Sequence, residues 1–276
     1  MAAEYLVLIG VEMDAVDFAY ADDVSRVEKR TAHLCGNRRV FGVSCDEYRQ
    51  HGAYAEFVAV PQDILYPLPP ELPFEHAALI EPVSVALHAV DLLKIKPGER
   101  AVVVGSGMIG LLVIQALRVG GCRDVIAVDI DAGRLRLARE LGATHTIDSK
   151  QTDAVAEILE VTNGRGADGA VEVVGNTAAL STAARSVARG GRVVLVGNIS
   201  PEVQLPLQIV VSRELMLLGS CASAGEYPRA IELVASGAIR VAPLISALAP
   251  LADGPQWFER LYAREPGLMK VVLQPT

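Results

Sequence analysis

Over the middle of the chain, short runs of apolar, mostly β-branched residues alternate with longer amphipathic stretches. The runs at 101–104 and 125–129 are short and continuous, as strands buried on both faces of a sheet are. Residues 108–119 have the period of a helix, and a second helix is expected to begin after the capping residue Asp131 and to stop at Gly142. This pattern predicts an α/β fold in which helices cover both faces of a doubly wound parallel sheet.

The same alternation continues toward residue 221. An alanine-rich helix is expected near residues 177–187, and Gly190 and Gly191 mark its end. Further apolar runs predict three more strands of the sheet, at residues 169–174, 192–196 and 215–219. Residues 92–221 are therefore assigned to one domain.

The chain on either side of this domain has a different pattern. Residues 53–60 alternate large and small side chains and predict a strand that ends at Pro61, after which further prolines indicate an extended loop. Residues 1–91 are therefore assigned to a second, β-rich domain. Residues 222–276 are too few to fold alone, so they are expected to return to that second domain. Their pattern predicts a helix and a strand, at residues 227–236 and 269–273.

Composition narrows the class of partner. The chain has 276 residues, of which 51% are hydrophobic, so it can bury the cores of two modest domains. Its formal net charge of −8 gives no basic surface for nucleic acid or anionic lipid, which leaves a small molecule as the expected partner. The four cysteines form no paired framework, and no basic, apolar leader precedes Glu4, so we expect a cytoplasmic protein.

One apolar stretch resembles a membrane span, because no charged residue lies between Arg100 and Arg118. The 17 residues between them are fewer than the roughly 20 that a spanning helix needs. Glycines in the first half of the stretch favour a strand, a tight turn and then a helix. We therefore expect no membrane association.

The glycines form a motif. Gly105-Ser106-Gly107-Met108-Ile109-Gly110 fits the pattern G-x-G-x-x-G of dinucleotide-binding turns. A lone match is weak evidence, but these glycines follow a predicted strand and open a predicted helix. Gly105 would allow the tight turn, Gly107 the approach of a pyrophosphate, and Gly110 close packing of the helix. Gly105, Gly107, Met108, Ile109 and Gly110 are therefore candidate cofactor-binding residues of a Rossmann domain.

Asp129 ends the next predicted strand, 24 residues after Gly105. The acidic residue that binds the adenosine ribose in Rossmann domains follows the glycines by about twenty residues. Because a carboxylate there would repel a 2′-phosphate, the sequence favours NAD over NADP. The alternative is that the glycines are only turn residues and that Asp129 is a surface charge.

Several segments on either side of the glycines carry a resemblance to a known family. They are Leu34-Cys35, residues 52–61, 77–89 and 190–197, Arg213-Glu214-Leu215, Gly219-Ser220 and residues 270–272. With these segments the chain resembles the zinc-containing medium-chain dehydrogenases, especially the branch of sorbitol, threonine and related alcohol dehydrogenases. The resemblance implies a Rossmann domain beside a GroES-like domain, NAD and zinc as cofactors, a small alcohol or polyol as substrate, and a homodimer or homotetramer.

The resemblance also assigns roles to single residues. It implies that Arg134 lies beside the adenosine, and that Val196, Gly197 and Ser220 line the nicotinamide pocket. The last expected strand of the Rossmann domain, near residues 215–220, could pair with its copy and so join two subunits.

The zinc ligands of the family are not found. The family holds its catalytic zinc with a cysteine in a Gly-x-Cys-Gly context and a His-Glu pair after glycine, whereas residues 1–33 contain no cysteine and only one histidine, His33. Glu81, in the Glu-Pro position of the family, is the remaining candidate ligand, and one carboxylate is no zinc site. Of the four cysteines of the structural-zinc lobe only Cys35 remains, since Val27 stands in place of the third.

We therefore expect an incomplete GroES-like domain with an atypical segment at 1–33. A truncated or frame-shifted gene product and a shortened paralogue would both have this pattern. Replacement ligands are not evident, because no spacing brings His51 or His33 to Glu81. His88 lies in an apolar run, where a hydrogen-bonded core histidine is commoner than a proton relay.

Three functions remain open. The first is a zinc-type NAD-dependent alcohol or polyol dehydrogenase, which transfers a hydride between a secondary alcohol and NAD and is impaired here by loss of the zinc ligands. The second is a catalytically silent NAD-binding fragment or subunit, which the missing ligands favour. The third is a zinc-independent reductase of the same superfamily, which would use NADPH; Asp129 and the Glu81-Pro82 pair argue against it.

Overall fold

The computed structural model describes residues 6–7, 32–34, 38–42 and 49–275. The chain divides into two compact units. One, the sheet unit, consists of Val85–Cys221 with Ala238–Arg240. The other, the mixed unit, consists of the described residues up to Ser84 and of those after Cys221 that the sheet unit does not include.

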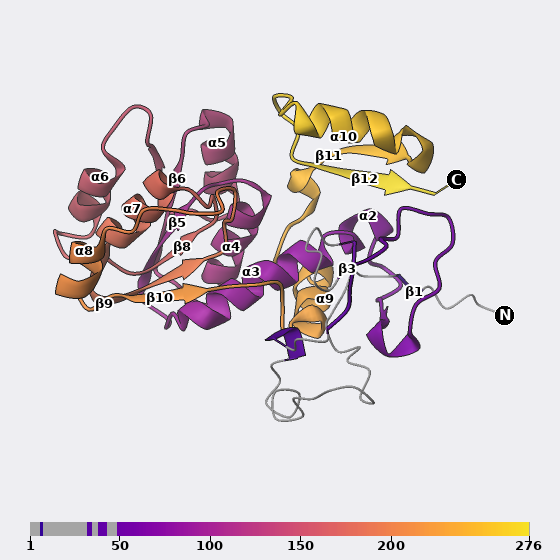
Figure 1. The fold of residues 1–276 in the computed structure, drawn as a ribbon, viewed down its shortest axis with the longest axis horizontal. Coiled ribbons are helices and arrows are strands. Elements are labelled where there is room, and N and C mark those ends of the chain that lie inside the picture. The colour runs from indigo at the N-terminus through magenta and orange to yellow at the C-terminus, as the bar shows by residue number, and fades with distance from the viewer. Residues whose placement is uncertain (1–5, 8–31, 35–37, 43–48, 276) are drawn as a thin grey trace. The chain divides into compact units, whose positions relative to one another are not determined.

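The sheet unit contains a six-stranded, fully parallel sheet in the order β10-β9-β8-β5-β6-β7 (Figure 1). Its strands are β5 (Arg100–Val104), β6 (Asp124–Asp129), β7 (His145–Asp148), β8 (Ala167–Glu172), β9 (Val187–Leu195) and β10 (Met216–Gly219). After β5 the chain adds β6 and β7 on one side, and it then returns to add β8 on the other side. The predicted doubly wound α/β fold is thus confirmed, and its topological switch point lies between β5 and β8.

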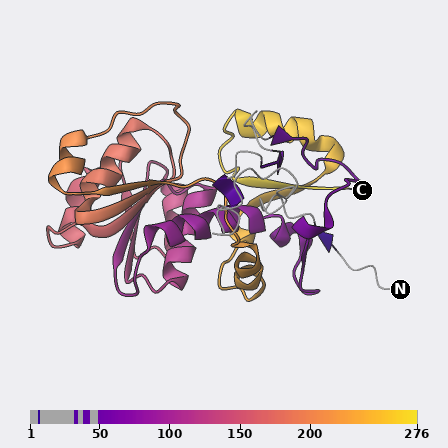
Figure 2. The ribbon, with the colours of Figure 1, turned by 60° about the horizontal axis from the view of Figure 1, so that its bottom comes forward.

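Helices lie on both faces of this sheet (Figures 1 and 2). They are α3 (Ile80–Leu93), α4 (Met108–Val119), α5 (Ala132–Glu140), α6 (Ala154–Val161), α7 (Thr177–Ser186) and the short α8 (Leu207–Ser212). On one face, Ile158 of α6 and Ala183 of α7 pack on Val102, Ile126 and other sheet residues in a continuous core. The opposite face is covered by α4 and α5, which contact each other as well as β5, β6 and β7.

Side-chain caps begin three of these helices. Asp131 accepts a hydrogen bond from the Arg134 amide at 2.9 Å, as the sequence predicts for α5. Asp153 and Asn176 cap α6 and α7 in the same way. Helix α4 differs, because its N-cap residue is Gly107, which has no side chain to satisfy the first amides of the helix.

Two expectations about local structure are wrong. Residues 53–60 form no strand: the Ala55 amide donates to the Ala53 carbonyl at 2.9 Å, which turns the chain, and no strand among the described residues pairs with the segment. Gly190 and Gly191 do not end a helix, because α7 stops at Ser186 and β9 begins at the next residue. The register of β9 against β8 shifts across the two glycines, so they belong to an irregularity within the strand.

The mixed unit has short elements. Among its described residues it has three two-stranded sheets, which pair β1 (Leu6–Val7) with β4 (Tyr66–Pro67), β2 (Val40–Phe41) with β3 (Arg49–Gln50), and β11 (Ile245–Pro250) with β12 (Lys270–Gln274). Its α-helices are α2 (Phe74–Ala77), α9 (Tyr227–Ala235) and α10 (Gly254–Tyr262), and its 3-10 turns are η2 (Ala32–Leu34), η3 (Gln62–Ile64), η4 (Ala242–Leu244) and η5 (Leu251–Asp253). The helix and the strand expected near the C-terminus are confirmed as α9 and β12. The GroES-like assignment stays a prediction.

One stretch, Phe74–Leu93, is long and apolar enough to cross a membrane by length and composition. Within the protein, 67% of its most apolar window is buried. Core helices have the same composition, so packing inside the protein accounts for its apolar character. The stretch between Arg100 and Arg118, considered from the sequence, contains β5, the glycine turn and the start of α4.

Candidate functional site

The glycine turn joins β5 to α4 at the carboxyl edge of the sheet. Gly105 has a φ of +102° and donates its amide to the Val128 carbonyl at 2.8 Å, which ties the turn to β6. A β-carbon added at Gly110 would lie 1.9 Å from the carbonyl oxygen of Gly105. Helix α4 can therefore begin directly against the turn only because both positions are glycine.

The start of α4 offers unused hydrogen-bond donors. The amides of Gly107, Met108, Ile109 and Gly110 have no acceptor among the described residues. A β-carbon added at Gly107 would meet nothing within 4 Å, so the space beside Gly107, where α4 begins, is open. Uncapped amides at the positive end of a helix dipole, beside open space, form an anion site.

Asp129 ends β6 beside this turn and is buried, with 8% of its surface exposed. Its Oδ2 accepts the Ser106 amide at 2.5 Å, so the carboxylate holds the glycine turn directly. Its Oδ1 accepts the amides of Ile130 and Asp131 at 2.7 and 2.9 Å. The sequence links Asp129 to the glycine motif only by its spacing from Gly105. The structure shows a direct link, the hydrogen bond from the Ser106 amide to the Asp129 carboxylate.

Val196, Gly197 and Ser220 lie at the same edge, beyond the switch point. The amides of Val196 and Gly197 donate to the Glu172 carbonyl at 2.8 and 3.1 Å, and the Ser220 amide donates to the Leu195 carbonyl at 2.9 Å. The Ser220 hydroxyl is buried and has no hydrogen-bond partner among the residues that the structure describes. These residues follow β9 and β10, whereas the glycine turn follows β5, so the expected site residues line one edge of one sheet.

Glu172 and Gly175 belong to this edge, and the sequence analysis missed them. Glu172 ends β8, is 2% exposed, and accepts the amides of Val174 and Gly175 on Oε1 at 2.7 and 2.8 Å. A β-carbon on Gly175 would lie 2.2 Å from the Asn198 amide nitrogen, so the loops after β8 and β9 touch through backbone. The signal available in the sequence was a glutamate at the end of an otherwise apolar strand.

The two remaining candidates are Arg134 and Glu81. Arg134 is exposed on the first turn of α5, and only its backbone amide is tied to the site, through the cap Asp131. Glu81 lies in the first turn of α3 and belongs to the mixed unit. The residue is exposed at the surface, yet the protein atoms around its carboxyl desolvate it and raise its pKa, an effect that the charge of Lys270 opposes.

Comparison with known proteins identifies the family. Residues 109–236 match the zinc-binding dehydrogenase family. The sorbitol dehydrogenase of Bacillus subtilis (strain 168) is 36% identical over 225 residues, which make up 81% of this chain and 64% of that protein. The structure of 2R,3R-butanediol dehydrogenase from Bacillus subtilis superposes with a TM-score of 0.77 at 34% identity, over 84% of this chain and 67% of that one. The chain belongs to the zinc-type medium-chain dehydrogenases.

Another relative carries a different nucleotide from the one that Asp129 favours. A protein described as a zinc-binding dehydrogenase from Sinorhizobium meliloti 1021, solved bound to NADP, superposes with a TM-score of 0.80 at 33% identity over 90% of this chain and 72% of that one. The chain is shorter than the curated relatives that it matches: it spans about two thirds of their length, 64% in the case of the sorbitol dehydrogenase.

Zinc-type dehydrogenases imply a metal site, and the described residues do not fit one. No three His, Cys, Asp or Glu side chains in that part of the chain lie close enough together to hold a metal ion. The one positional match, Glu81, lies in the field of the Lys270 ammonium, which disfavours a second cation. Cys35 and Val27, the two positions compared with the structural-zinc lobe of the family, lie outside the described residues.

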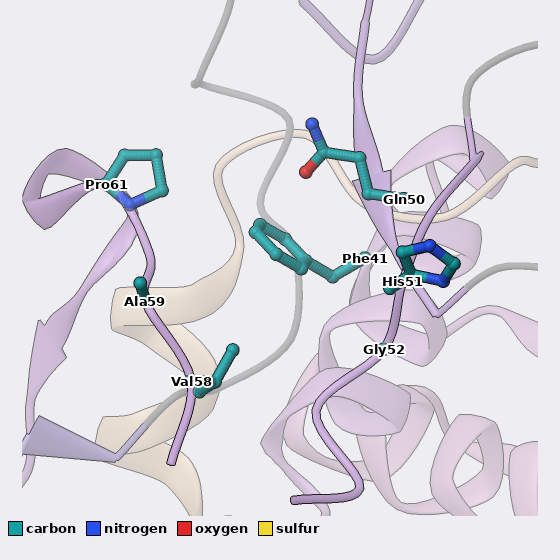
Figure 3. Close-up of a pocket in the computed structure, with 7 residues that line it drawn as sticks. All are labelled: Phe41, Gln50, His51, Gly52, Val58, Ala59 and Pro61. Atoms are coloured by element: carbon teal, nitrogen blue, oxygen red, sulfur yellow. The ribbon is translucent and has the colours of Figure 1, made fainter.

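A cavity of about 810 Å³ in the mixed unit contains His51, the histidine weighed as a replacement ligand. In Figure 3, Phe41 stands between the segment of Val58, Ala59 and Pro61 and the segment that carries Gln50, His51 and Gly52. No carboxylate or thiol is among its described lining residues. His51 therefore has no partner ligand among the described lining residues, and the candidate site of this chain is the one at the sheet edge.

Proposed function

We propose that this chain binds NAD(H) at the carboxyl edge of its parallel sheet and serves the oxidation of a secondary alcohol, in the manner of a polyol or alcohol dehydrogenase. One observation carries the proposal: four amides at the start of α4 have no acceptor among the described residues, the space beside Gly107 is open, and a buried aspartate ends the adjacent strand. Phosphates bind at such helix N-termini, and the switch point between β5 and β8 is where ligands bind in open α/β sheets.

The residues at the edge fit the two halves of a dinucleotide. The amides of Gly107, Met108, Ile109 and Gly110 would hold the pyrophosphate, with Asp129 and Arg134 on the adenosine side, over β6. Val196, Gly197 and Ser220 would line the nicotinamide on the other side, over β9 and β10. When bound, the nicotinamide supplies a hydride acceptor, and the chain orients it and keeps water away.

The choice of NAD over NADP rests on Asp129. Its two oxygens already accept three amides, and these hydrogen bonds fix the carboxylate at the end of the strand. Oδ2, which accepts only the Ser106 amide, keeps a second lone pair that a ribose hydroxyl can use, whereas a 2′-phosphate would meet a fixed negative charge. A relative at 33% identity was solved bound to NADP, so the preference has to be measured.

The substrate class is proposed from the relatives. Sorbitol dehydrogenase and butanediol dehydrogenase, by their names, act on a polyol and a diol. We therefore propose a small alcohol or polyol as substrate, and a dimer or tetramer as the assembly. The free thiols of Cys122 and Cys221 agree with the reducing, cytoplasmic compartment that we propose.

A second candidate function is binding of NAD without turnover. The observation in its favour is that the described residues build no group of three metal ligands, although the family polarises its alcohol with zinc. In this case the chain would lend a cofactor-binding unit to an assembly. No catalytic residue is assigned here under either candidate.

The test is titration calorimetry of the full chain with NAD and with NADP, together with elemental analysis for zinc on the same sample. We expect saturable binding of NAD that exceeds the binding of NADP. Reduction of NAD in the presence of sorbitol, xylitol or 2,3-butanediol would then separate the two candidates, since only the dehydrogenase turns over. Absence of binding by either nucleotide would refute the proposal as a whole.

A further inference from the structure

Glu172 carries a buried charge that packing alone does not explain. Its side chain is 2% exposed at the end of β8, and no lysine or arginine pairs with it among the described residues. Burial raises the pKa of its carboxyl, while the Gly175 and Val174 amides act in the opposite direction. Burying a carboxylate that has two amide donors but no cation partner costs free energy, and a neutral side chain could serve if only a hydrogen-bond acceptor were needed.

The position of Glu172 indicates what its carboxylate does. Glu172 pairs in register with Val104, the last residue of β5, so it lies at the switch point of the sheet. Its Oε1 fixes the Val174 and Gly175 amides, and its carbonyl accepts the amides of Val196 and Gly197. One residue therefore holds both loops that follow β8 and β9.

The turn at Val174 and Gly175, which Glu172 fixes, contacts the glycine turn on one side and the loop after β9 on the other. Toward the glycine motif, a β-carbon on Gly105 would lie 2.7 Å from Cγ2 of Val174, so this side chain packs against the turn. Toward the other side, the Ser200 amide donates to the Gly175 carbonyl at 2.9 Å. A displacement of the turn would therefore be transmitted to the loop of Val196 and Gly197.

We propose that Glu172 is a positioning residue of the dinucleotide site, whose carboxylate sets the loop that receives the nicotinamide half relative to the glycine turn. This inference rests on the proposed function. The adenosine half depends on Glu172 less, because Asp129 and the Val128 carbonyl hold the glycine turn independently. Glu172 should thus matter for binding the whole dinucleotide and hardly matter for binding its adenosine part.

The test compares NAD and AMP binding by calorimetry in Glu172→Gln and Glu172→Ala. Charged acceptors form hydrogen bonds about twice as strong as neutral ones, so we expect affinity for NAD to fall roughly threefold with Gln and roughly tenfold or more with Ala. Affinity for AMP should change by less than about twofold by the same reasoning. The graded recovery by Gln is expected of a positioning role, because Gln keeps an acceptor of the same shape.

Asp168→Asn is the matched control. Asp168 lies near the other end of β8, accepts the Arg100 amide at 2.9 Å and pairs with Arg165 at 2.7 Å, so its loss should lower the melting temperature and leave both affinities unchanged. If Glu172→Ala does not fold, Glu172→Gln carries the test alone.

Three results would overturn the inference about Glu172. These are equal losses of NAD and AMP affinity, NAD affinity in folded Glu172→Gln equal to that of the unchanged protein, and a loss of NAD affinity in Asp168→Asn. An unchanged chain that binds neither nucleotide would instead overturn the proposed function, and the inference with it. The two failures are therefore distinguishable.

Discussion

Gly110 lies directly against Gly105, so closely that a β-carbon on Gly110 would come within 1.9 Å of the Gly105 carbonyl oxygen. The atom that it would meet is backbone, which cannot rotate away. Gly107, in the same motif, has a φ of −70°, which any residue adopts, and its β-carbon would meet nothing within 4 Å. The motif thus contains two glycines that the fold requires, Gly105 with its φ of +102° and Gly110, and one that the fold does not require, Gly107.

This difference predicts that one added methyl group lowers affinity for NAD at Gly107 and lowers stability at Gly110. Gly107→Ala should leave the melting temperature unchanged and lower affinity for NAD by roughly tenfold or more, because the methyl group occupies the space through which a pyrophosphate must approach. Gly110→Ala should lower the melting temperature, because α4 must move away from the turn. Thermal unfolding and calorimetry on both variants check this. Gly107→Ala with unchanged affinity for NAD would mean that the glycines serve only the turn.

The elements of the sheet unit were predictable because each is specified by residues that lie close together in the sequence. Parallel strands buried on both faces are short apolar runs, and caps such as Asp131 mark where helices begin, so β5, α4, β6 and α5 follow from the sequence to within a residue or two. The expected strand at residues 53–60 failed for the opposite reason. A strand needs a partner, and alternation along one segment says nothing about whether a partner is present.

The candidate site was predictable only in part, for a related reason. The spacing of Asp129 from the glycines can be read along the chain, whereas the use of Glu172 also depends on the amides of Val196 and Gly197, which follow a different strand, β9. Similarly, Gly175 and Gly197 are 22 positions apart by their numbers, and only the fold shows that their backbones touch. Close approaches between loops leave no periodic signal.

Asp129→Asn should reduce both stability and the preference for NAD. The asparagine amide group would face one of the three backbone donors that the carboxylate now accepts, and the loss of a hydrogen bond to a buried charged group costs about 2 kcal/mol. Removal of the charge should also raise affinity for NADP relative to NAD by roughly tenfold. Denaturant unfolding and the ratio of the two dissociation constants check these effects. An unchanged ratio would assign Asp129 to the turn alone.

The edge strand β10 predicts association of two copies. Among the described strands β10 pairs with β9 alone, and Met216 on it is 50% exposed. Leu207 and Val211 of α8, the helix that precedes β10 in the chain, are 62% and 67% exposed. An uncovered edge strand with an exposed apolar side chain favours pairing with a second copy. We expect the chain to elute as a dimer or larger assembly in size-exclusion chromatography, and Met216→Lys to shift it toward the monomer.

Val119→Lys is the control for this prediction, because Val119 is also exposed and apolar but lies at the end of α4. It should leave the elution volume unchanged. A monomeric unchanged protein, or equal shifts by both variants, would refute association through β10.

Cys122 should resist alkylation in the folded protein. Burial raises the pKa of its thiol to about 11, with the charge of Arg118 acting in the opposite direction, and its Sγ lies 3.0 Å from the Glu99 carbonyl oxygen. Because the thiolate is the reactive form, iodoacetamide at neutral pH should modify the exposed Cys221 first. Peptide mass spectrometry with and without denaturant measures the difference. Fast modification of Cys122 in the folded protein would contradict its burial.

The same raised pKa of Cys122 predicts how stability depends on pH. An unfolded thiol with the ordinary pKa of 9.0 loses its proton before the folded thiol, whose pKa is about 11. Stability from the buried neutral thiol is therefore fully present below pH 9 and is lost as the pH rises toward 11. Cys122→Ala removes this titration while other groups still titrate. The difference in unfolding free energy between the unchanged protein and Cys122→Ala should therefore fall across that interval, and a constant difference would show that the thiol ionises equally in both states.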